Sequence, residues 1–221
     1  MVEFLTARGT ISAIENIISE ANTLLFLVSP YLQPPKVLLD KLQDASSRHV
    51  SIVIIYRKGE VKVETLEQLR RLGNLSLCCC ENLHAKCYFN EKAMVITSMN
   101  FVEASEKNWE IGMLLKKAED EKVFTEAVKE IISLWKSSVR ELSSQGVPPY
   151  RGKRQVSGYC IRCSKPIPLD SSRPHCTECY YEWEFWGNPN YPEKVCHVCG
   201  KSAEVTRLYP RCESCYRKSR R

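Results

Sequence analysis

The sequence lacks any apolar run long enough to cross a membrane. Its longest uncharged aliphatic stretches, residues 24–28 and 50–55, have the length of a strand and fall far short of the roughly 20 residues that a bilayer requires. The start of the chain also lacks a basic segment followed by an apolar stretch, which excludes a secretory signal. We therefore expect no membrane span and a cytoplasmic location.

The composition lacks the bias of a disordered or fibrous protein. With 43% hydrophobic and 26% charged residues the chain has ordinary globular usage, and its 221 residues allow one or two domains. Histidine is scarce, with four residues, whereas cysteine is abundant, with twelve. In a reducing compartment, so many cysteines indicate metal binding or catalysis rather than disulfides.

Cysteine and charge divide the chain at the same place. Four cysteines lie between residues 78 and 87, and the other eight follow residue 159. Residues 147–221 hold 14 basic and 7 acidic side chains, whereas residues 1–146 hold 18 and 19. The two parts are separated by a polar, basic stretch with proline and glycine that suits neither a helix nor a strand. We predict a first domain over 1–143, a basic linker over 144–157 and a second domain over 158–221.

The first part alternates helix-like and strand-like segments. Apolar residues recur with helical spacing over 11–21, 37–45, 63–72 and 123–135. Short apolar runs typical of buried strands cover 23–28, 50–56, 75–80, 85–89, 93–97 and 111–115. This alternation predicts an α/β fold in which helices flank a mixed sheet.

Polar side chains gather around two of these predicted strands. His84 and Lys86 are two residues apart, so in a strand they share one face while Cys87 points to the packed side. Ser98 and Asn100 follow another strand with the same spacing and can donate hydrogen bonds to one anion. A nucleophile, a cation and neutral donors in this arrangement suit a phosphate group.

These residues resemble the phospholipase D superfamily, whose motif is His-x-Lys-x4-Asp followed by Gly-Ser-x-Asn. The resemblance covers roughly residues 1–140 in element order, and Glu110 lies in the Asn-x-Glu-φ-Gly context often seen after the motif. Two positions depart from it, because Glu91 replaces the Asp and Thr97 replaces the Gly. The Asp of the family is thought to act structurally, so the first departure leaves the nucleophile in place.

The resemblance implies a two-step mechanism that needs no metal. His84 would attack phosphorus to give a phosphohistidine that water hydrolyses, and Glu110 would orient its imidazole. Lys86, Ser98 and Asn100 would donate to the non-bridging oxygens, where charge gathers. A second imidazole must protonate the leaving oxygen, yet the chain has a single His-x-Lys motif. Since family members with one motif form a two-fold dimer, the resemblance implies a homodimer whose two His84 side chains share one site.

The second part predicts two metal sites. Its eight cysteines form two quartets of Cys-x-x-Cys pairs: Cys160, Cys163, Cys176 and Cys179, then Cys196, Cys199, Cys212 and Cys215. A shift of 36 residues superposes the quartets and indicates an internal duplication. Four thiolates complete a tetrahedral structural zinc site, so we predict tandem zinc ribbons with one structural ion each and no catalytic metal. Iron–sulfur ligation or redox chemistry is the alternative.

The ribbons have the composition of a nucleic-acid-binding module. Aromatic residues between 180 and 191 and a basic C-terminus suit a strand whose bases stack. Each zinc with four thiolates carries −2, however, so the formal excess of +7 in residues 147–221 falls to about +3. The same aromatic residues also suit a small core that joins the two ribbons.

Together these features favour a phospholipase D-like phosphodiesterase, most simply an endonuclease that cleaves DNA or RNA as a homodimer while its ribbons bind the nucleic acid. Two alternatives remain open. The chain could be a catalytically weak or inactive dimeric scaffold for nucleic acid or protein. It could also be a phospholipid phosphodiesterase, because the motif recognises a phosphodiester and not the group esterified to it.

Overall fold

The computed structural model describes residues 1–102, 108–143 and 157–219, which fall into two compact units, Met1–Pro148 and Pro149–Arg221. Except for Ser157, the predicted linker over 144–157 lies outside the described residues. No helix in the described ranges is both long enough and apolar enough to cross a membrane.

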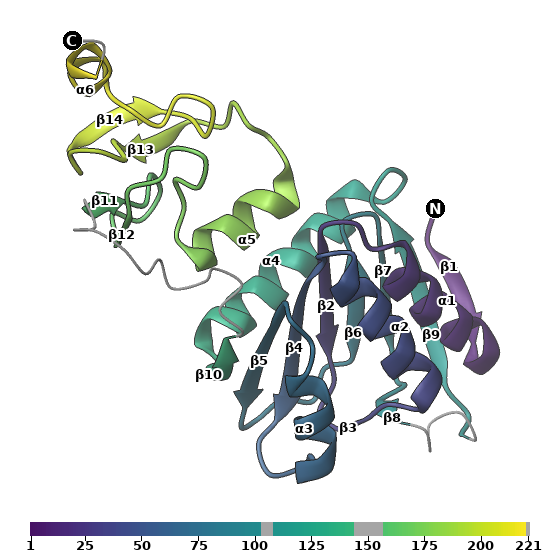
Figure 1. Ribbon diagram of the computed structural model, residues 1–221. Coiled ribbons are helices and arrows are strands. Elements are labelled where there is room, and N and C mark those ends of the chain that lie inside the picture. Colours follow the sequence, from purple (N-terminus) through teal and green to yellow (C-terminus); the bar gives the residue numbers. More distant parts are fainter. Residues whose placement is uncertain (103–107, 144–156, 220–221) are drawn as a thin grey trace. The chain divides into compact units, whose positions relative to one another are not determined.

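The first unit is built on one mixed sheet with the strand order β1-β9-β7-β6-β2-β4-β5-β10 (Figure 1). Its strands are β1 (Glu3–Thr6), β2 (Leu24–Val28), β4 (Ser51–Arg57), β5 (Leu75–Cys80), β6 (Cys87–Asn90), β7 (Ala93–Thr97), β9 (Ile111–Lys116) and β10 (Val139–Ser143). Strands β2, β4 and β5 run parallel, and every other neighbouring pair is antiparallel. Two short strands, β3 (Leu32–Gln33) and β8 (Phe101–Val102), pair separately.

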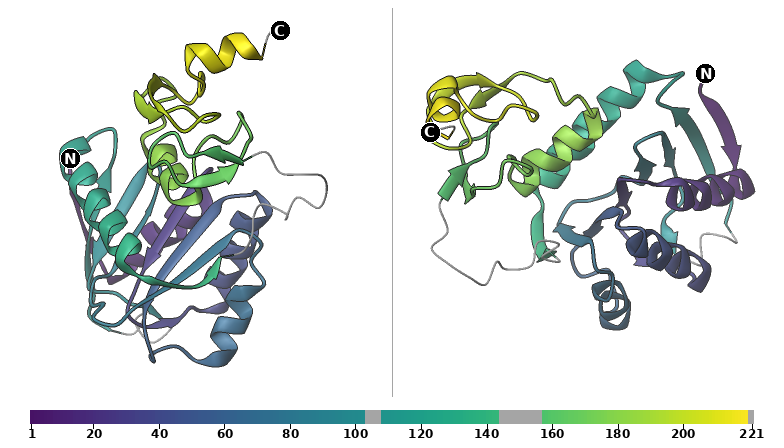
Figure 2. Two further views of the ribbon diagram at one scale, coloured as in Figure 1. Left: turned by 90° about the vertical axis from the view of Figure 1, so that its left-hand side faces the viewer. Right: turned by 45° about the horizontal axis from the view of Figure 1, so that its top comes forward.

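Helices cover both faces of this sheet (Figure 2). They are α1 (Ala7–Glu20), α2 (Lys36–Ser47) and α3 (Val63–Arg70) on one face and α4 (Glu121–Ser137) on the other. On the α4 face, Phe26 of β2 stacks on Phe89 with ring centres 4.9 Å apart and meets Trp135 of α4 edge-on at 6.1 Å. Burial on both faces explains why the central strands β2, β4, β5 and β6 are continuous apolar runs rather than alternating ones. The predicted α/β fold with a mixed, helix-flanked sheet is confirmed.

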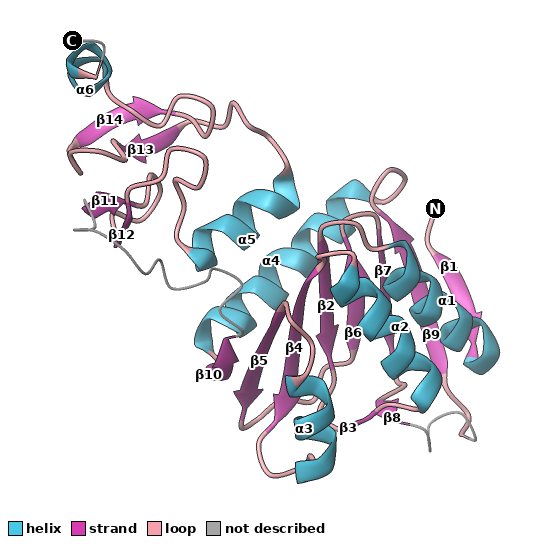
Figure 3. Cartoon of the chain, in the orientation of Figure 1, coloured by secondary structure: helices cyan, strands magenta, loops and turns pink. Residues whose placement is uncertain are grey.

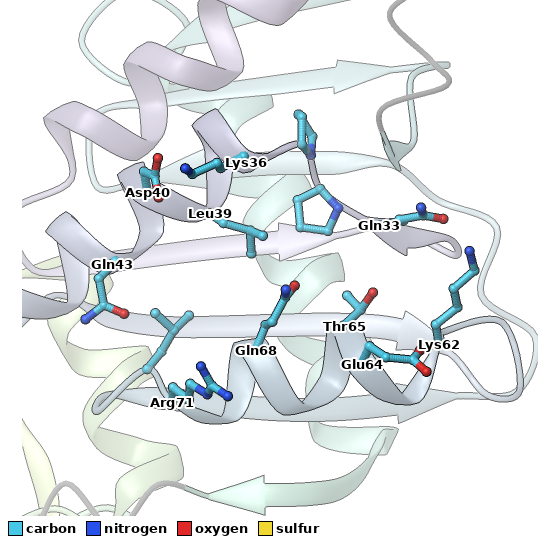
Figure 4. A pocket seen from close by; sticks show the side chains of 13 residues that line it. Gln33, Lys36, Leu39, Asp40, Gln43, Lys62, Glu64, Thr65, Gln68 and Arg71 are labelled. Atoms are coloured by element: carbon cyan, nitrogen blue, oxygen red, sulfur yellow. The ribbon is translucent and has the colours of Figure 1, made fainter.

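A groove of about 750 Å³ opens between α2 and α3 (Figure 4). It runs from Gln33 and Lys62 at one end to Gln43 and Arg71 at the other, and its lining is largely polar and charged. None of the five residues that the sequence predicts to be catalytic lines it.

The second unit repeats one small motif. Its hairpins are β11 (Ser157–Tyr159) with β12 (Pro166–Pro168) and β13 (Glu193–Val195) with β14 (Ser202–Val205), and its helices are α5 (Thr177–Trp186) and α6 (Glu213–Lys218) (Figure 3).

Backbone geometry shows the duplication directly. The Ser164 amide donates to the Cys160 carbonyl at 3.0 Å, and the equivalent bond from Gly200 to Cys196 is 2.9 Å long. Ser164 and Gly200, 36 positions apart, both adopt a left-handed backbone, with φ of 64° and 68°. The two repeats therefore share one turn conformation.

Candidate active site

The segments that carry the predicted catalytic residues meet at one edge of the first sheet, the lower edge in Figure 1. Strand β2 ends there, and because β6 is antiparallel to β2, with Val28 opposite Cys87, β6 begins there. Strand β7 ends at the same edge, with Thr97 opposite Gly112 near the start of β9. Sheet register thus gathers residues 84–86, 98–100 and 108–110.

His84 and Lys86 lie just before β6, which begins two residues later than predicted. The His84 side chain is exposed, and among the described residues it has no hydrogen-bond partner. The Lys86 ammonium donates to the His84 backbone carbonyl at 3.0 Å, which ties the positive charge to the segment that carries His84. Burial raises the pKa of Cys87 to about 12, so the neighbouring thiol stays protonated and is no rival nucleophile.

Ser98 joins the other two segments. The Thr97 amide donates to the Lys86 carbonyl at 3.2 Å, and the Ser98 amide donates to the Ile111 carbonyl at 3.1 Å. The Ser98 hydroxyl donates to the Glu110 carboxylate and accepts from the Ile111 amide at 3.2 Å. In the described part of the chain, Glu110 is therefore paired with Ser98 and makes no hydrogen bond or ion pair with the His84 imidazole.

Asn100 lies in a loop that two buried side chains hold in place. The Tyr88 hydroxyl donates to the Met99 carbonyl at 2.9 Å, and the Ser29 hydroxyl accepts from the Phe101 amide at 2.9 Å. Burial raises the pKa of Tyr88, so its hydroxyl remains a neutral donor. The Asn100 amide oxygen is buried without a hydrogen-bond partner among the described residues, which leaves an unused hydrogen-bond acceptor at this edge.

Sequence reasoning missed Ser29 and Tyr88. Ser29 follows β2 in a segment that resembles an ordinary exposed loop, although it is buried. In a strand, Tyr88 would lie on the same face as His84 and Lys86, which the sequence predicts to be the open face. It is buried because helices cover the sheet there. A polar residue at the carboxyl end of a parallel strand was the available signal for Ser29.

The two departures from the family motif both have structural partners. The Glu91 carboxylate accepts from the backbone amides of Asn22 at 3.0 Å and Thr23 at 3.5 Å, so it closes the turn between α1 and β2. The Thr97 hydroxyl donates to the Ile111 carbonyl at 2.5 Å and accepts from the Met99 amide at 3.0 Å. Neither side chain takes the place of a predicted catalytic residue.

The second unit brings both cysteine quartets together. The sulfurs of Cys160, Cys163, Cys176 and Cys179 lie within 4.8 Å of one another, as do those of Cys196, Cys199, Cys212 and Cys215. The Cys163 and Cys176 sulfurs are 3.6 Å apart, and those of Cys199 and Cys212 are 3.9 Å apart. A tetrahedral ion with zinc–sulfur bonds of about 2.3 Å requires sulfurs roughly 3.8 Å apart. Both quartets therefore fit one ion each.

The histidines of the second unit have structural partners. The buried His175 ring contacts Glu193 at 3.1 Å, and Arg162 donates to the same carboxylate at 2.6 Å. Burial is the main cause that lowers the pKa of His175. The His197 ring contacts the Tyr159 carbonyl at 2.7 Å.

Part of the aromatic group is engaged in contacts within this unit. The Arg207 guanidinium lies 3.8 Å from the centre of the Trp183 ring, which also stacks with His175 at 5.9 Å. The Trp183 indole donates to the Asn188 carbonyl at 2.9 Å. Trp183 is thus engaged within the unit, whereas Tyr191, at 50% exposed, presents much of its ring to solvent.

Comparison with solved structures supports the fold. Nuc from Salmonella typhimurium, a phospholipase D family member, is 16% identical with a TM-score of 0.55, and the match covers 65% of this chain and 99% of that chain. NucT from Helicobacter pylori is 15% identical with a TM-score of 0.55, over 63% and 98%. Phosphatidylserine synthase from Haemophilus influenzae Rd KW20 is 16% identical with a TM-score of 0.50, over 63% and 39%.

Sequence comparison gives the family. The search of curated proteins finds no match. A family model described as cardiolipin synthase, PLD-like domain, matches residues 14–135, more than half of the chain and all five predicted catalytic positions. The chain therefore belongs to this family of phospholipase D-like domains.

Proposed function

We propose that the protein is an endonuclease that cleaves DNA or RNA through a phosphohistidine at His84, in a site shared by two copies of the chain. The observation that carries this proposal is the meeting of five residues at one sheet edge: His84, Lys86, Ser98, Asn100 and Glu110. The fold is that of the phospholipase D superfamily, whose members are phosphodiesterases.

The exposed His84 imidazole suits the role of nucleophile. Its nitrogen forms a bond to phosphorus as the bond from phosphorus to the leaving oxygen breaks, and His84 of the partner subunit protonates that oxygen. Water then attacks phosphorus, breaks the nitrogen–phosphorus bond and gives its proton to the same partner imidazole. Lys86 and Asn100 stabilise the charge that develops on the non-bridging oxygens.

An exposed apolar patch on the sheet supports the homodimer. Ile96, Met113 and Phe4 are register partners across β7, β9 and β1, so they lie side by side, and they are 42%, 49% and 65% exposed. Ile111, which directly follows Glu110, extends this sheet-face patch to the catalytic edge and is 58% exposed. Monomeric proteins seldom leave such contiguous apolar surface uncovered. A second copy that packs on the patch would bring its own His84 close to this site.

The ribbons are proposed to hold the nucleic acid, with one structural zinc ion in each quartet. The described part of the unit exposes basic side chains at Lys165, Arg173, Lys194, Lys201, Arg217 and Lys218. These side chains suit contacts with a phosphate backbone. Zinc would fix the knuckles that carry them and take no part in cleavage.

The test uses end-labelled single- and double-stranded DNA and RNA, incubated briefly in EDTA with the wild type and with His84→Ala. We expect discrete products from the wild type only, while dimer mass and zinc content are the same in both proteins. Equal binding without cleavage would favour the scaffold. Release of a headgroup from phospholipid vesicles, with no nucleic-acid cleavage, would favour the lipid phosphodiesterase.

A further inference from the structure

We propose that Arg57 and Tyr31 form a second phosphate-binding subsite, which holds the backbone phosphate next to the one that reacts. This inference rests on the proposed nuclease function and adds a contact outside the family motif.

The subsite lies on the same sheet edge as the catalytic residues. Arg57 ends β4, and its amide donates to the Pro30 carbonyl at 3.2 Å, which continues the β2–β4 ladder past the end of β2. Strand β2 separates β4 from β6, so Arg57 is two strand spacings, roughly 10 Å, from the segment that holds His84 and Lys86. When a nucleic-acid strand is bound with one phosphate at His84, its next phosphate can lie close enough to contact Arg57.

A buried hydroxyl ties the subsite to the catalytic loop. Ser29, which is 1% exposed, accepts from the Phe101 amide at 2.9 Å and donates to the Tyr31 carbonyl at 2.7 Å. The same side chain thereby fixes the loop that carries Asn100 and the residue that supports Arg57. The two phosphate-binding elements are held in one geometry.

The Arg57 guanidinium is positioned but keeps donors available. It lies 4.7 Å from the centre of the Tyr31 ring, and its Nη2 donates to the Tyr31 hydroxyl and to the Glu60 carboxylate at 2.9 Å. Among the described residues no acceptor contacts Nε or Nη1. A held guanidinium with open donors on one side matches the planar, bidentate geometry of a phosphate group.

The experiment measures binding of a fluorescein-labelled single-stranded oligonucleotide to full-length His84→Ala protein over a series of salt concentrations. Adding Arg57→Ala should raise the Kd about tenfold and reduce the slope of log K against log salt by about 0.7, the loss of one phosphate contact. Tyr31→Phe, which removes the hydroxyl that holds Arg57, should weaken binding two- to threefold, a smaller change in the same direction.

Arg71→Ala is the matched control, because it removes an equal charge near the amino end of β5, away from the catalytic edge, and should change neither quantity. Equal effects of Arg57→Ala and Arg71→Ala, or no effect of either, would overturn the subsite and leave the nuclease proposal standing. If the His84→Ala parent does not bind and the wild type does not cleave, the proposed function fails and the subsite fails with it. Should Arg57→Ala lower the melting temperature, Arg57→Gln must show the same loss of slope.

Discussion

Ser98 and Glu110 raise a question about catalytic roles at the scale of single residues. The family resemblance assigns Glu110 to the nucleophilic imidazole and Ser98 to the phosphate, whereas the structure joins their side chains to each other. The single hydroxyl hydrogen of Ser98 is given to Glu110, so the hydroxyl must turn away from the carboxylate before it can donate to a phosphate oxygen. Glu110 can therefore act by holding the Ser98 side chain at the site until the phosphate binds. The two assignments predict different couplings between the residues.

We expect Ser98→Ala and Glu110→Gln each to lower kcat roughly 10- to 100-fold, and the double variant to lower it no further than the worse single one. Residues that act as one unit are non-additive, so a double-mutant cycle on kcat for oligonucleotide cleavage measures the coupling. If the two losses of kcat multiply in the double variant, Glu110 acts independently of Ser98, with His84 as its natural partner.

The residue-level predictions came from motif spacing, which is why they reach Asn100 but not Ser29 and Tyr88, the two side chains that hold its loop. Ser29 and Tyr88 are buried and bond to backbone groups of a loop that is distant in the sequence. Motif spacing carries no information on such contacts. Glu91 was predicted in part. Its position was found from the motif, but its hydrogen bonds to the turn after α1 depend on how the chain packs.

At the scale of elements, the apolar pattern predicted the strands that carry a continuous apolar run best. The bounds of β5 and β7 equal the predicted 75–80 and 93–97, whereas β1 and β10 were not predicted. Strand β1 lies at the edge of the sheet and buries only Leu5, so it shows no apolar run. Strands β3 and β8 have two residues each, too few for any periodicity.

The duplicated ribbons give an element-scale prediction, because one repeat has glycine where the other has serine. At φ of 64° Ser164 has a left-handed backbone that costs a side-chain-bearing residue roughly 1 kcal/mol, so Ser164→Gly should raise the free energy of unfolding by about 0.5–1 kcal/mol. The measurement is the denaturant midpoint of zinc release from the full chain. The reciprocal change Gly200→Ser should destabilise, since a Cβ there would lie 3.0 Å from the Tyr159 ring. Equal midpoints for all three proteins would contradict this account of the turn.

At the scale of the whole molecule, the two proposed zinc ions would change the charge balance on which the proposed nucleic-acid binding depends. The formal net charge of +6 falls to about +2 when two ions with four thiolates each are counted. A field this weak attracts a polyanion little at physiological salt, so the proposed binding would have to come from local contacts such as the one proposed for Arg57. The uneven charge along the sequence therefore overstates, by itself, how strongly charge would support the proposed nucleic-acid binding.

The sheet-face patch carries the prediction about assembly. Met113 lies at its centre, between the register partners Ile96 and Phe4, so Met113→Glu should place a charge in the proposed interface. We expect this variant to be monomeric by light scattering and to cleave at least 100-fold more slowly, because a single His84 would have no second imidazole to protonate the leaving oxygen. Zinc content should stay at two ions per chain. Val63→Glu is the control, since Val63 is 63% exposed on α3, on the opposite face of the sheet, and should change neither mass nor rate. A wild type that is monomeric and fully active would show instead that one chain supplies the whole site.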